Sequence, residues 1–317
     1  MFRLTSNINI ADRWRFKGMV SVEVVSSWDQ LTDTATLTVP KKINWQGEPL
    51  VFSNNPILKK GNPLSIEMGL NYRNAEWFKG YITAIHAGKE VTVDCQDAMF
   101  LLKKGTFTKA YEKAKLSQIL RDMMPASVPY EVVADYDFGQ LRISNATPAQ
   151  VLEQLRQDYF VRSFFRDGKL YAGLAVVPKL QQTHRLKWVI DNNLEYINKD
   201  EVKILIKGVI MDAKNKKETI EVGDKDGEVR TFHQYNISKT EMKRLCEQEL
   251  ERLKYSGFRG SFTTFIEPYI NHGDVVYLPE LYDVDTEGGY LVKKVTRSFD
   301  GTKARQNVEL ERKILTD

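Results

Sequence analysis

Short runs that alternate apolar and polar residues with a period of two, or that are rich in β-forming residues, recur over residues 18–98, and strand-like runs return from residue 202 to residue 311. Alternation of this kind is typical of antiparallel strands with one face on a core and one face in solvent. Breakers such as Asn54-Asn55-Pro56 separate the runs at short intervals, as in a β-barrel or β-sandwich. The strands are expected at 19–25, 35–39, 64–68, 77–85 and 91–93, and at 202–211, 258–266, 274–278, 290–298 and 307–311.

The stretch between these two regions has a different character. Apolar residues at intervals of three and four predict a short amphipathic helix that stops before Pro125. A second helix is predicted to begin at Pro148 with Thr147 as its cap, because proline fits the first turn, where no N–H donor is needed. A hairpin should follow around Asp167-Gly168, since both residues tolerate the positive φ angles of a tight turn. We therefore expect a small α+β module over residues 105–190.

One further helix is predicted inside the second β-region, over residues 238–256. Ser238 and Glu241 have the spacing of a capping box, and Gly257 is expected to end the helix. A hairpin is expected around residues 224–227, upstream of this helix.

These patterns predict a chain of the α+β class that is mainly β. A length of 317 residues suits about two domains, each large enough for its own core. We expect a first β-barrel domain over residues 1–104, the α+β module over 105–190, and a second β-barrel domain with an inserted helix over 191–317.

The two β-regions share an order of features that suggests a duplicated domain. In each, a Gly precedes one strand, a Gly-Tyr pair opens the next, and a further alternating strand follows. One topology is therefore expected for both regions. The positions predicted to shape the turns are Gly61, Gly80 and Tyr81 in the first copy and Gly273, Asp274, Gly289 and Tyr290 in the second.

The order of parts along the chain resembles the phage tail baseplate hub family. This family includes the late control protein D group and the hub part of contractile-injection spike proteins. The stretches that match best are residues 115–120 (KLSQIL), 147–155 (TPAQVLEQL), 165–170 (FRDGKL), 272–276 (HGDVV) and 289–292 (GYLV).

The resemblance implies two tail-tube-like antiparallel β-barrels per chain and a homotrimer with pseudo-sixfold symmetry. Such a ring joins the hexameric tail tube, or a distal tail protein, to a separate trimeric tail spike protein. It also implies a virion structural protein of a phage or prophage, assembled in the bacterial cytoplasm and located in the tail, with phage DNA passing through the ring.

The sequence offers little chemistry for catalysis or metal binding. Four histidines are scattered without helical pairing, and the two cysteines, Cys95 and Cys246, are far apart and are expected to be buried apolar residues. Residues 283–288 open like a calcium loop, but Lys294 stands where the last carboxylate ligand is required. We therefore assign no catalytic, metal-binding or cofactor-binding residue and expect a protein that is not an enzyme.

The sequence leaves two alternative functions open. A tail-associated cell-wall hydrolase needs two facing carboxylates, whose separation depends on the fold. An OB-type nucleic-acid-binding protein would use the basic run at 207–217, although no aromatic residues interleave there and the net charge of the chain is only +4.

No stretch approaches the length of a membrane-spanning helix, so no membrane insertion is expected. The five tryptophans suit either a core or an interface.

Overall fold

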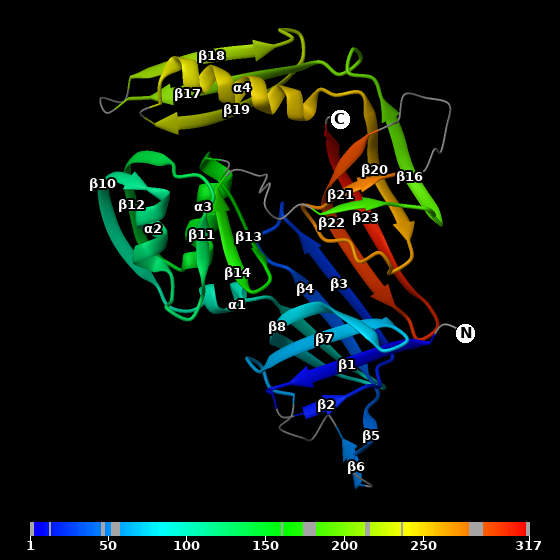
Figure 1. Cartoon of the computed structure of the whole chain (residues 1–317). Helices are drawn as coiled ribbons and strands as arrows, with labels where there is room; N and C mark the ends of the chain where they lie inside the picture. The colour runs from blue at the N-terminus through cyan, green and yellow to red at the C-terminus, as the bar shows by residue number, and fades with distance from the viewer. Residues whose placement is uncertain are drawn as a thin grey trace.

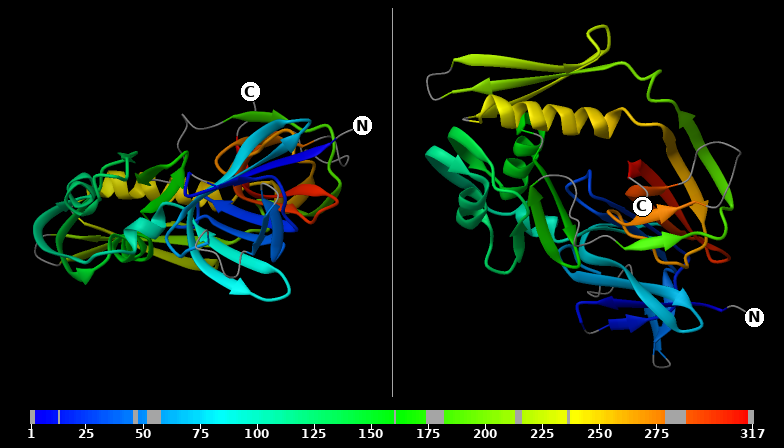
Figure 2. Two further views of the ribbon diagram at one scale, coloured as in Figure 1. Left: turned by 90° about the horizontal axis from the view of Figure 1, so that it is seen from below. Right: turned by 45° about the horizontal axis from the view of Figure 1, so that its top comes forward.

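The protein is described by a computed structural model over residues 3–314, except 13, 46–47, 52–57, 160, 174–181, 213–215, 236 and 279–287. It is an α+β protein that is mainly β, as predicted. Two β-units lie side by side, and the α+β module lies at the opposite end of the molecule (Figures 1 and 2). A further sheet with a long helix lies above the module. No helix among the described residues is long and apolar enough to cross a membrane.

The first β-unit forms because its alternating residues place one face of each strand in a common core. Val22 and Val24 are buried on one strand and Leu37 and Val39 on the next, while the residues between them are more exposed. The strands are β1 (Leu4–Ile10), β2 (Trp14–Phe16), β3 (Ser21–Ser27), β4 (Thr34–Val39), β7 (Pro63–Leu70), β8 (Arg73–Ala87) and β9 (Val91–Gln96), with a small hairpin of β5 (Lys42–Trp45) and β6 (Glu48–Val51).

The second β-unit has its own core, which includes Phe262, Val292 and Val308. Its strands are β15 (Thr183–Arg185), β16 (Asp191–Ile197), β20 (Gly257–Thr264), β21 (Val275–Tyr277), β22 (Gly289–Phe299) and β23 (Ala304–Ile314). The acidic loop considered as a calcium site, residues 283–288, falls mostly outside the described residues.

Both units have the same strand order and the same strand directions. The first runs β3-β4-β9-β8-β7 and the second β16-β20-β23-β22-β21, with every neighbouring pair antiparallel. Along the chain, the strands at these places also follow one another in the same sequence. The predicted common topology is therefore confirmed.

The two units are joined into one open sheet, because β22 of the second unit pairs with β3 of the first. Among the described residues, the strands at the two ends of this sheet, β16 and β2, each pair with a single neighbour. The sheet is therefore not closed into a barrel within this chain. The sequence could not reveal this, because alternation reports which face of a strand is buried and not which strands pair.

The α+β module packs around the buried side chains of its two main helices. Its hairpin turns at Asp167 and Gly168, both with positive φ, as predicted. The elements are α1 (Met99–Leu102), β10 (Phe107–Lys115), α2 (Leu116–Met123), β11 (Tyr130–Val132), β12 (Asp137–Ala146), α3 (Pro148–Tyr159), β13 (Arg162–Arg166) and β14 (Lys169–Gly173).

Thr147 caps α3 as predicted, and Gln150 completes a capping box. The Gln150 N–H donates to Thr147 Oγ1 at 3.2 Å, and the Thr147 N–H donates to Gln150 Oε1 at 2.8 Å. Thr147→Ala should lower the free energy of unfolding by about 0.5–2 kcal/mol, because it leaves one N–H of the first turn unpaired. A urea titration monitored by circular dichroism would measure this change, and an unchanged midpoint would contradict it.

The helix predicted at 238–256 is α4 (Lys239–Leu253), and it belongs to a unit inserted between β16 and β20. This unit also contains β17 (Ile204–Met211), β18 (Lys217–Gly223) and β19 (Glu228–Tyr235). Met242 and Cys246 of α4 pack against β17, and β19 contacts the module. Gly257 does not end the helix. It lies four residues beyond Leu253 and opens β20 with a φ of +154°.

The hairpin expected around residues 224–227 is wrong, because β17 lies between β18 and β19. The segment that joins β18 to β19 crosses the start of β17. A Cβ on Gly227 would come within 2.5 Å of the Ile204 nitrogen there. A turn signal cannot distinguish a hairpin from such a crossover. The basic run forms the β17–β18 hairpin instead, with its tip partly outside the described residues.

Candidate functional site

The predicted turn position Gly61 closes the start of β7 onto β8. It has a φ of +90°, which favours glycine, and its N–H donates to the Ile82 carbonyl at 2.7 Å. The Ile82 N–H donates back to the Asn62 carbonyl at 3.0 Å. This pair of hydrogen bonds sets the register of the first unit.

Gly273 repeats this arrangement in the second unit. It has a φ of +79°, its N–H donates to the Val292 carbonyl at 2.7 Å, and the Val292 N–H donates to the Asp274 carbonyl at 2.8 Å. Gly61 and Gly273 are therefore structurally equivalent, and Ile82 corresponds to Val292.

The Gly-Tyr pairs, in contrast, are one residue out of register. Tyr81 lies opposite Pro63, two residues after Gly61, whereas the residue opposite Val275, two after Gly273, is Leu291. A shift of one residue turns a side chain to the other face of a strand. The expected equivalence of Gly80 with Gly289 and of Tyr81 with Tyr290 is therefore wrong.

The two tyrosines accordingly do different things. Tyr81 is half-buried and stacks on Phe100, with ring centroids 5.4 Å apart. Tyr290 is fully buried in the second core, and its hydroxyl accepts a hydrogen bond from the Phe258 N–H at 3.3 Å. The two glycines also approach different neighbours. A Cβ would lie 2.2 Å from the Gln96 carbonyl at Gly80 and 2.7 Å from Val275 at Gly289.

A bulge follows the equivalent positions in both units. The pairing of β8 with β9 skips Thr83, and the pairing of β22 with β23 skips Lys293. A bulge bends the strand and increases its twist. Since the bulges match, the two units are aligned residue by residue along β8 and β22.

The joint between the two units is a buried, hydrogen-bonded contact. β22 pairs with β3 from Lys294 opposite Ser27 to Phe299 opposite Val22. Trp28, which is 2% exposed, donates from Nε1 to the Val292 carbonyl at 3.1 Å. Its ring packs with Leu291 of the second unit and with a phenylalanine of the module, so three parts of the chain meet at one side chain.

A buried cation lies beside this joint. Arg297 donates to Asn271 Oδ1 at 2.9 Å and to the Ile270 carbonyl, and its guanidinium lies 4.0 Å from the ring centre of Tyr269. Tyr269 in turn donates to the carbonyl of Glu76 on β8. Burial lowers the pKa of Arg297. This cluster fixes the second unit against the first.

Asp274, predicted only as a turn position, is the centre of a buried ionic network. It accepts hydrogen bonds from Arg166 at 3.1 Å, from His184 at 3.1 Å and from the Asn271 N–H at 2.9 Å. Burial opposes ionisation, but hydrogen bonds from His184 and Asn271 and the charge of Arg166 outweigh it and hold the pKa of Asp274 below its usual value. Because Arg166 comes from the module, this network ties the module to the second unit.

The sequence did not reveal the side-chain partners of Asp274, because Arg166 and His184 lie 108 and 90 positions away in the chain. A signal was present, since Asp274 is the one charged residue in the run Gly273-Asp274-Val275-Val276. A carboxylate at the start of a buried strand needs compensating donors.

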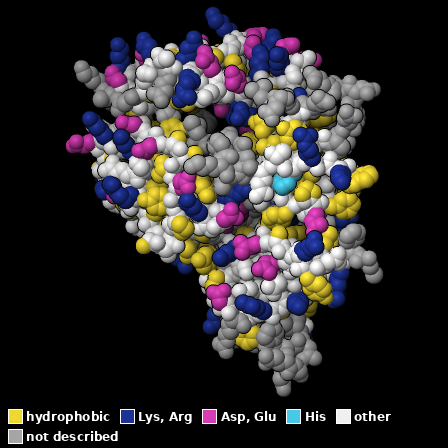
Figure 3. All heavy atoms as spheres, viewed as in Figure 1, with side chains coloured by type: hydrophobic (Ala, Val, Ile, Leu, Met, Phe, Trp, Pro, Cys, Tyr) yellow, Lys and Arg dark blue, Asp and Glu magenta, His cyan; other side chains and the backbone are white. Residues whose placement is uncertain are grey.

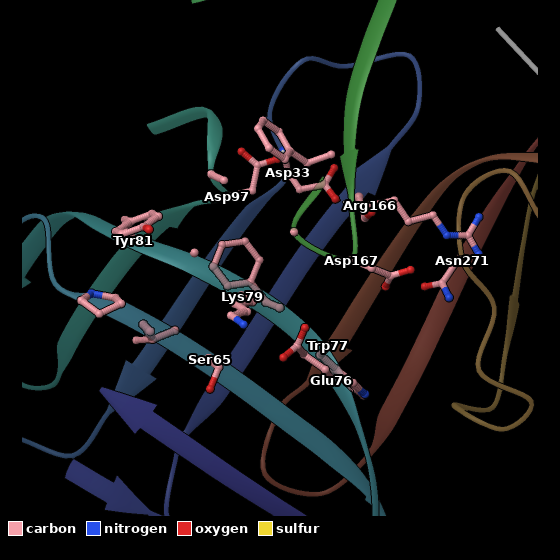
Figure 4. A pocket seen from close by; sticks show the side chains of 18 of the residues that line it. Asp33, Ser65, Glu76, Trp77, Lys79, Tyr81, Asp97, Arg166, Asp167 and Asn271 are labelled. Carbon is pink, nitrogen blue, oxygen red and sulfur yellow. Dashed lines mark hydrogen bonds between the residues drawn. The ribbon is translucent and has the colours of Figure 1, made fainter. Parts of the chain in front are cut away.

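A cavity of about 370 Å³ lies where the two β-units and the module meet. Figure 4 shows Asp33 beside Asp97 at one end and Arg166 beside Asn271 at the other, with Lys79 of β8 facing the space. The lining is mixed in charge. The Asp33 N–H donates to Asp97 Oδ2 at 2.9 Å, so the two acids connect the β3–β4 turn to the end of β9.

These carboxyls are occupied by structural contacts. Asp97 also accepts the Met99 N–H at 2.9 Å, while Asp33 accepts from Ser26 at 2.6 Å and from the Ser27 N–H at 3.0 Å. Burial raises the pKa of both acids, that of Asp33 to about 7. Among the described residues, no three His, Cys, Asp or Glu side chains are grouped closely enough to hold a metal ion.

Asp33 is expected to make stability fall as the pH rises from about 4 to about 7. In the unfolded chain its carboxyl loses its proton near 4, whereas burial keeps the folded form protonated up to about 7. Within this window the folded state binds the additional proton, so raising the pH favours unfolding. The difference in unfolding free energy between wild type and Asp33→Asn, measured by urea titration across this range, should therefore change steadily with pH. A constant difference would contradict the prediction.

Comparison with solved structures identifies the fold. The chain is similar to the 43 kDa tail protein of prophage MuSo2 from Shewanella oneidensis, at 15% identity and a TM-score of 0.65, over 98% of this chain and 97% of that one. It is also similar to a tail protein from Neisseria meningitidis MC58, at 10% identity and a TM-score of 0.68, over 98% and 96%.

A third similar structure is an Escherichia coli component of the type VI secretion system, itself structurally similar to bacteriophage T4 tail proteins. It matches at 10% identity and a TM-score of 0.58, over 98% of this chain and 76% of that one. No family model matches the sequence. No curated protein matches it either. The predicted resemblance to phage tail hub proteins is thus confirmed at the level of the fold.

Proposed function

We propose that this chain, which has the fold of prophage tail proteins, is a baseplate hub protein of a phage or phage-like tail. Three copies would form a ring with pseudo-sixfold symmetry between a hexameric tail tube and a trimeric spike. The observation that carries this proposal is the repeat of one five-strand topology twice in each chain, with matched glycines and matched bulges.

The mechanism would be geometric. Three chains with two similar units each present six similar surfaces, so one face of the ring suits a sixfold partner while the chains themselves remain threefold. The β22–β3 pairing and the Trp28 contact hold the two units of a chain in one relative orientation. That orientation must be fixed, because a ring closes only if every step between units is alike.

Different parts of the chain would have different roles in the ring. The two β-units, largely within residues 1–104 and 191–317, would build the ring, and closure into a barrel would occur between subunits. The module at 105–190 would lie outside it, together with the inserted unit that it contacts. The partners would be further copies of this chain, a tail tube or distal tail protein and a tail spike protein, with phage DNA passing through the ring.

The proposed role is structural and not enzymatic, in the virion tail. The contacts of Asp33 and Asp97 support this, because these two carboxyls of the cavity hold backbone N–H groups in place. A cell-wall hydrolase would need two carboxylates that reach a glycosidic bond.

The test is the mass in solution of the chain alone and of the chain co-expressed with its neighbouring tail genes. Light scattering should give three times the 36.6 kDa of one chain in at least one of these conditions. A stable monomer or a twofold dimer under both conditions would overturn the proposal, because neither presents six similar surfaces. Clearing of peptidoglycan in a zymogram would favour the hydrolase instead.

A further inference from the structure

Two of the strand segments that have an open edge among the described residues are β16 and the end of β8. β16 is the end strand of the sheet and pairs only with β20. β8 pairs with β9 along residues 84–87, but its other edge is covered by β7 only as far as Tyr81. Open edges of this kind are templates for pairing with another chain.

The internal repeat shows what each open edge corresponds to. Residues 84–87 of β8 are equivalent to residues 294–297 of β22, since Ile82 corresponds to Val292. β16 is equivalent to β3, because each is the outer strand of its unit and pairs antiparallel with the strand that follows it there, β20 or β4. Within the chain, the segment of β22 pairs with β3. The β22–β3 contact between the units thus has an equivalent in β16 and residues 84–87 of β8, whose facing edges have no partner among the described residues.

We infer that β16 of one copy of this chain pairs antiparallel with residues 84–87 of β8 of the next copy. The register follows from the pairing inside the chain. Thr296 lies opposite Val25, and their equivalents are His86 and Glu195. By the same alignment, Ile85 comes opposite Tyr196 and Ala87 opposite Leu194. The inference rests on the proposed trimer and specifies the contact that builds it.

The chemistry of the two edges is complementary. A histidine and a carboxylate face each other at one position, and an apolar residue faces an aromatic one at the next, both of which are favourable cross-strand pairs. The side chain of His86 is 64% exposed, so its ring is accessible at the surface. It also forms a hydrogen bond with Asp94 of the neighbouring strand β9. Glu195 is exposed as well.

Apolar side chains gather around β16 in a way that suits a covered surface. Trp188 is 70% exposed, Ile190 is 45% exposed and Tyr196 is 36% exposed, all within nine residues of one another. Figure 3 shows hydrophobic side chains on the flank of the molecule where β16 lies. Aromatic residues are enriched at subunit interfaces, where burial of such a group stabilises the complex.

The contact is head-to-tail, because it joins the first unit of one chain to the second unit of the next. Contacts of this type form rings when the rotation closes. Three such joints would alternate with the three joints inside the chains and would join the open sheets into one closed sheet. No strand edge at these positions would then remain unpaired.

Cysteine cross-linking in the assembled protein tests the inference. His86→Cys with Glu195→Cys places two thiols directly opposite each other, at a distance that a disulfide spans. The control pair is His86→Cys with Asp191→Cys, in which the second thiol lies on the same face of β16 but about 13 Å further along. Both native cysteines are buried, so the introduced thiols are the accessible ones.

Oxidation of the co-expressed protein should give covalent dimers and trimers on a non-reducing gel for the first pair. The control pair should give at least about tenfold less, because a disulfide cannot bridge that distance. A trimer by light scattering in which the first pair stays uncrosslinked, or crosslinks no better than the control, would overturn the inferred register and leave the proposed function standing. Absence of any trimer in wild type under both conditions would overturn both.

Hydrogen exchange on the wild-type protein gives a readout that needs no substitution. Amides of residues 84–87 and 194–197 should exchange more slowly in the trimer than in the monomer, because pairing protects them. The turn at Asp300 and Lys303, on the tip of β22–β23, is exposed and serves as the reference. Equal exchange rates in monomer and trimer at both segments would contradict the inference.

Discussion

Replacing Asp274 with alanine is expected to lower the free energy of unfolding by about 3–5 kcal/mol, because it leaves the guanidinium of Arg166 charged, buried and without its carboxylate. The Arg166 side chain is only 8% exposed and that of Asp274 is fully buried. His184 loses its partner in the same step. Urea denaturation followed by tryptophan fluorescence would measure the loss.

Two further variants separate the effect of the negative charge of Asp274 on stability from the effect of losing any aspartate. Asp274→Asn keeps an acceptor for the Asn271 N–H but removes the negative charge, and it should fall between wild type and Asp274→Ala. The first unit already carries Asn62 at the equivalent position, so the backbone accepts an amide there. Asp226→Ala removes an exposed ion pair with Lys203 and should change stability little. Equal losses for Asp274→Ala and Asp226→Ala would contradict the role assigned to the network.

Trp28→Ala should cost about 3–5 kcal/mol and should also prevent assembly of the ring. The side chain fills the contact between the two β-units and the module, and its Nε1 hydrogen bond to Val292 would be lost. Any chain that still folds would hold its two units less firmly, so its steps around the ring would no longer be alike. Thermal unfolding measures the first effect, and light scattering of the co-expressed protein measures the second.

Trp188→Ala is the matched control, because it removes the same side chain from an exposed position. With 70% of its surface in solvent, Trp188 contributes little to the folded monomer, so its removal should leave thermal unfolding nearly unchanged. Its place beside β16 predicts weaker association of subunits. A large loss of monomer stability in Trp188→Ala, or none in Trp28→Ala, would contradict this division of roles.

The candidate site could be predicted only in part. Gly61 and Gly273, predicted as turn positions, both have a positive φ, a backbone conformation that is set locally and that glycine favours. The Gly-Tyr pairs suggested an equivalence that is wrong by one residue, because a short motif does not determine which residues of two strands lie opposite each other. Asp274 was recognised as a turn residue, but its ionic partners were not.

The sequence by itself determined the local features of this protein. Alternation of apolar residues predicts the strands, and Thr147 predicts the start of α3, because a strand face and a helix cap depend on neighbouring residues. The repeated order of these features predicted that the two β-units share one topology, and the strand order confirms it.

Only the tertiary structure decided how these elements meet. Trp28 bonds a carbonyl 264 positions away, and β17 enters between β18 and β19 although β18 and β19 are consecutive in the chain. The same holds for the pairing of β22 with β3, which leaves β16 as one end strand of the joined sheet. Apolar patterning specifies that a face must be buried but leaves open what buries it, and that choice depends on contacts between residues far apart in the chain.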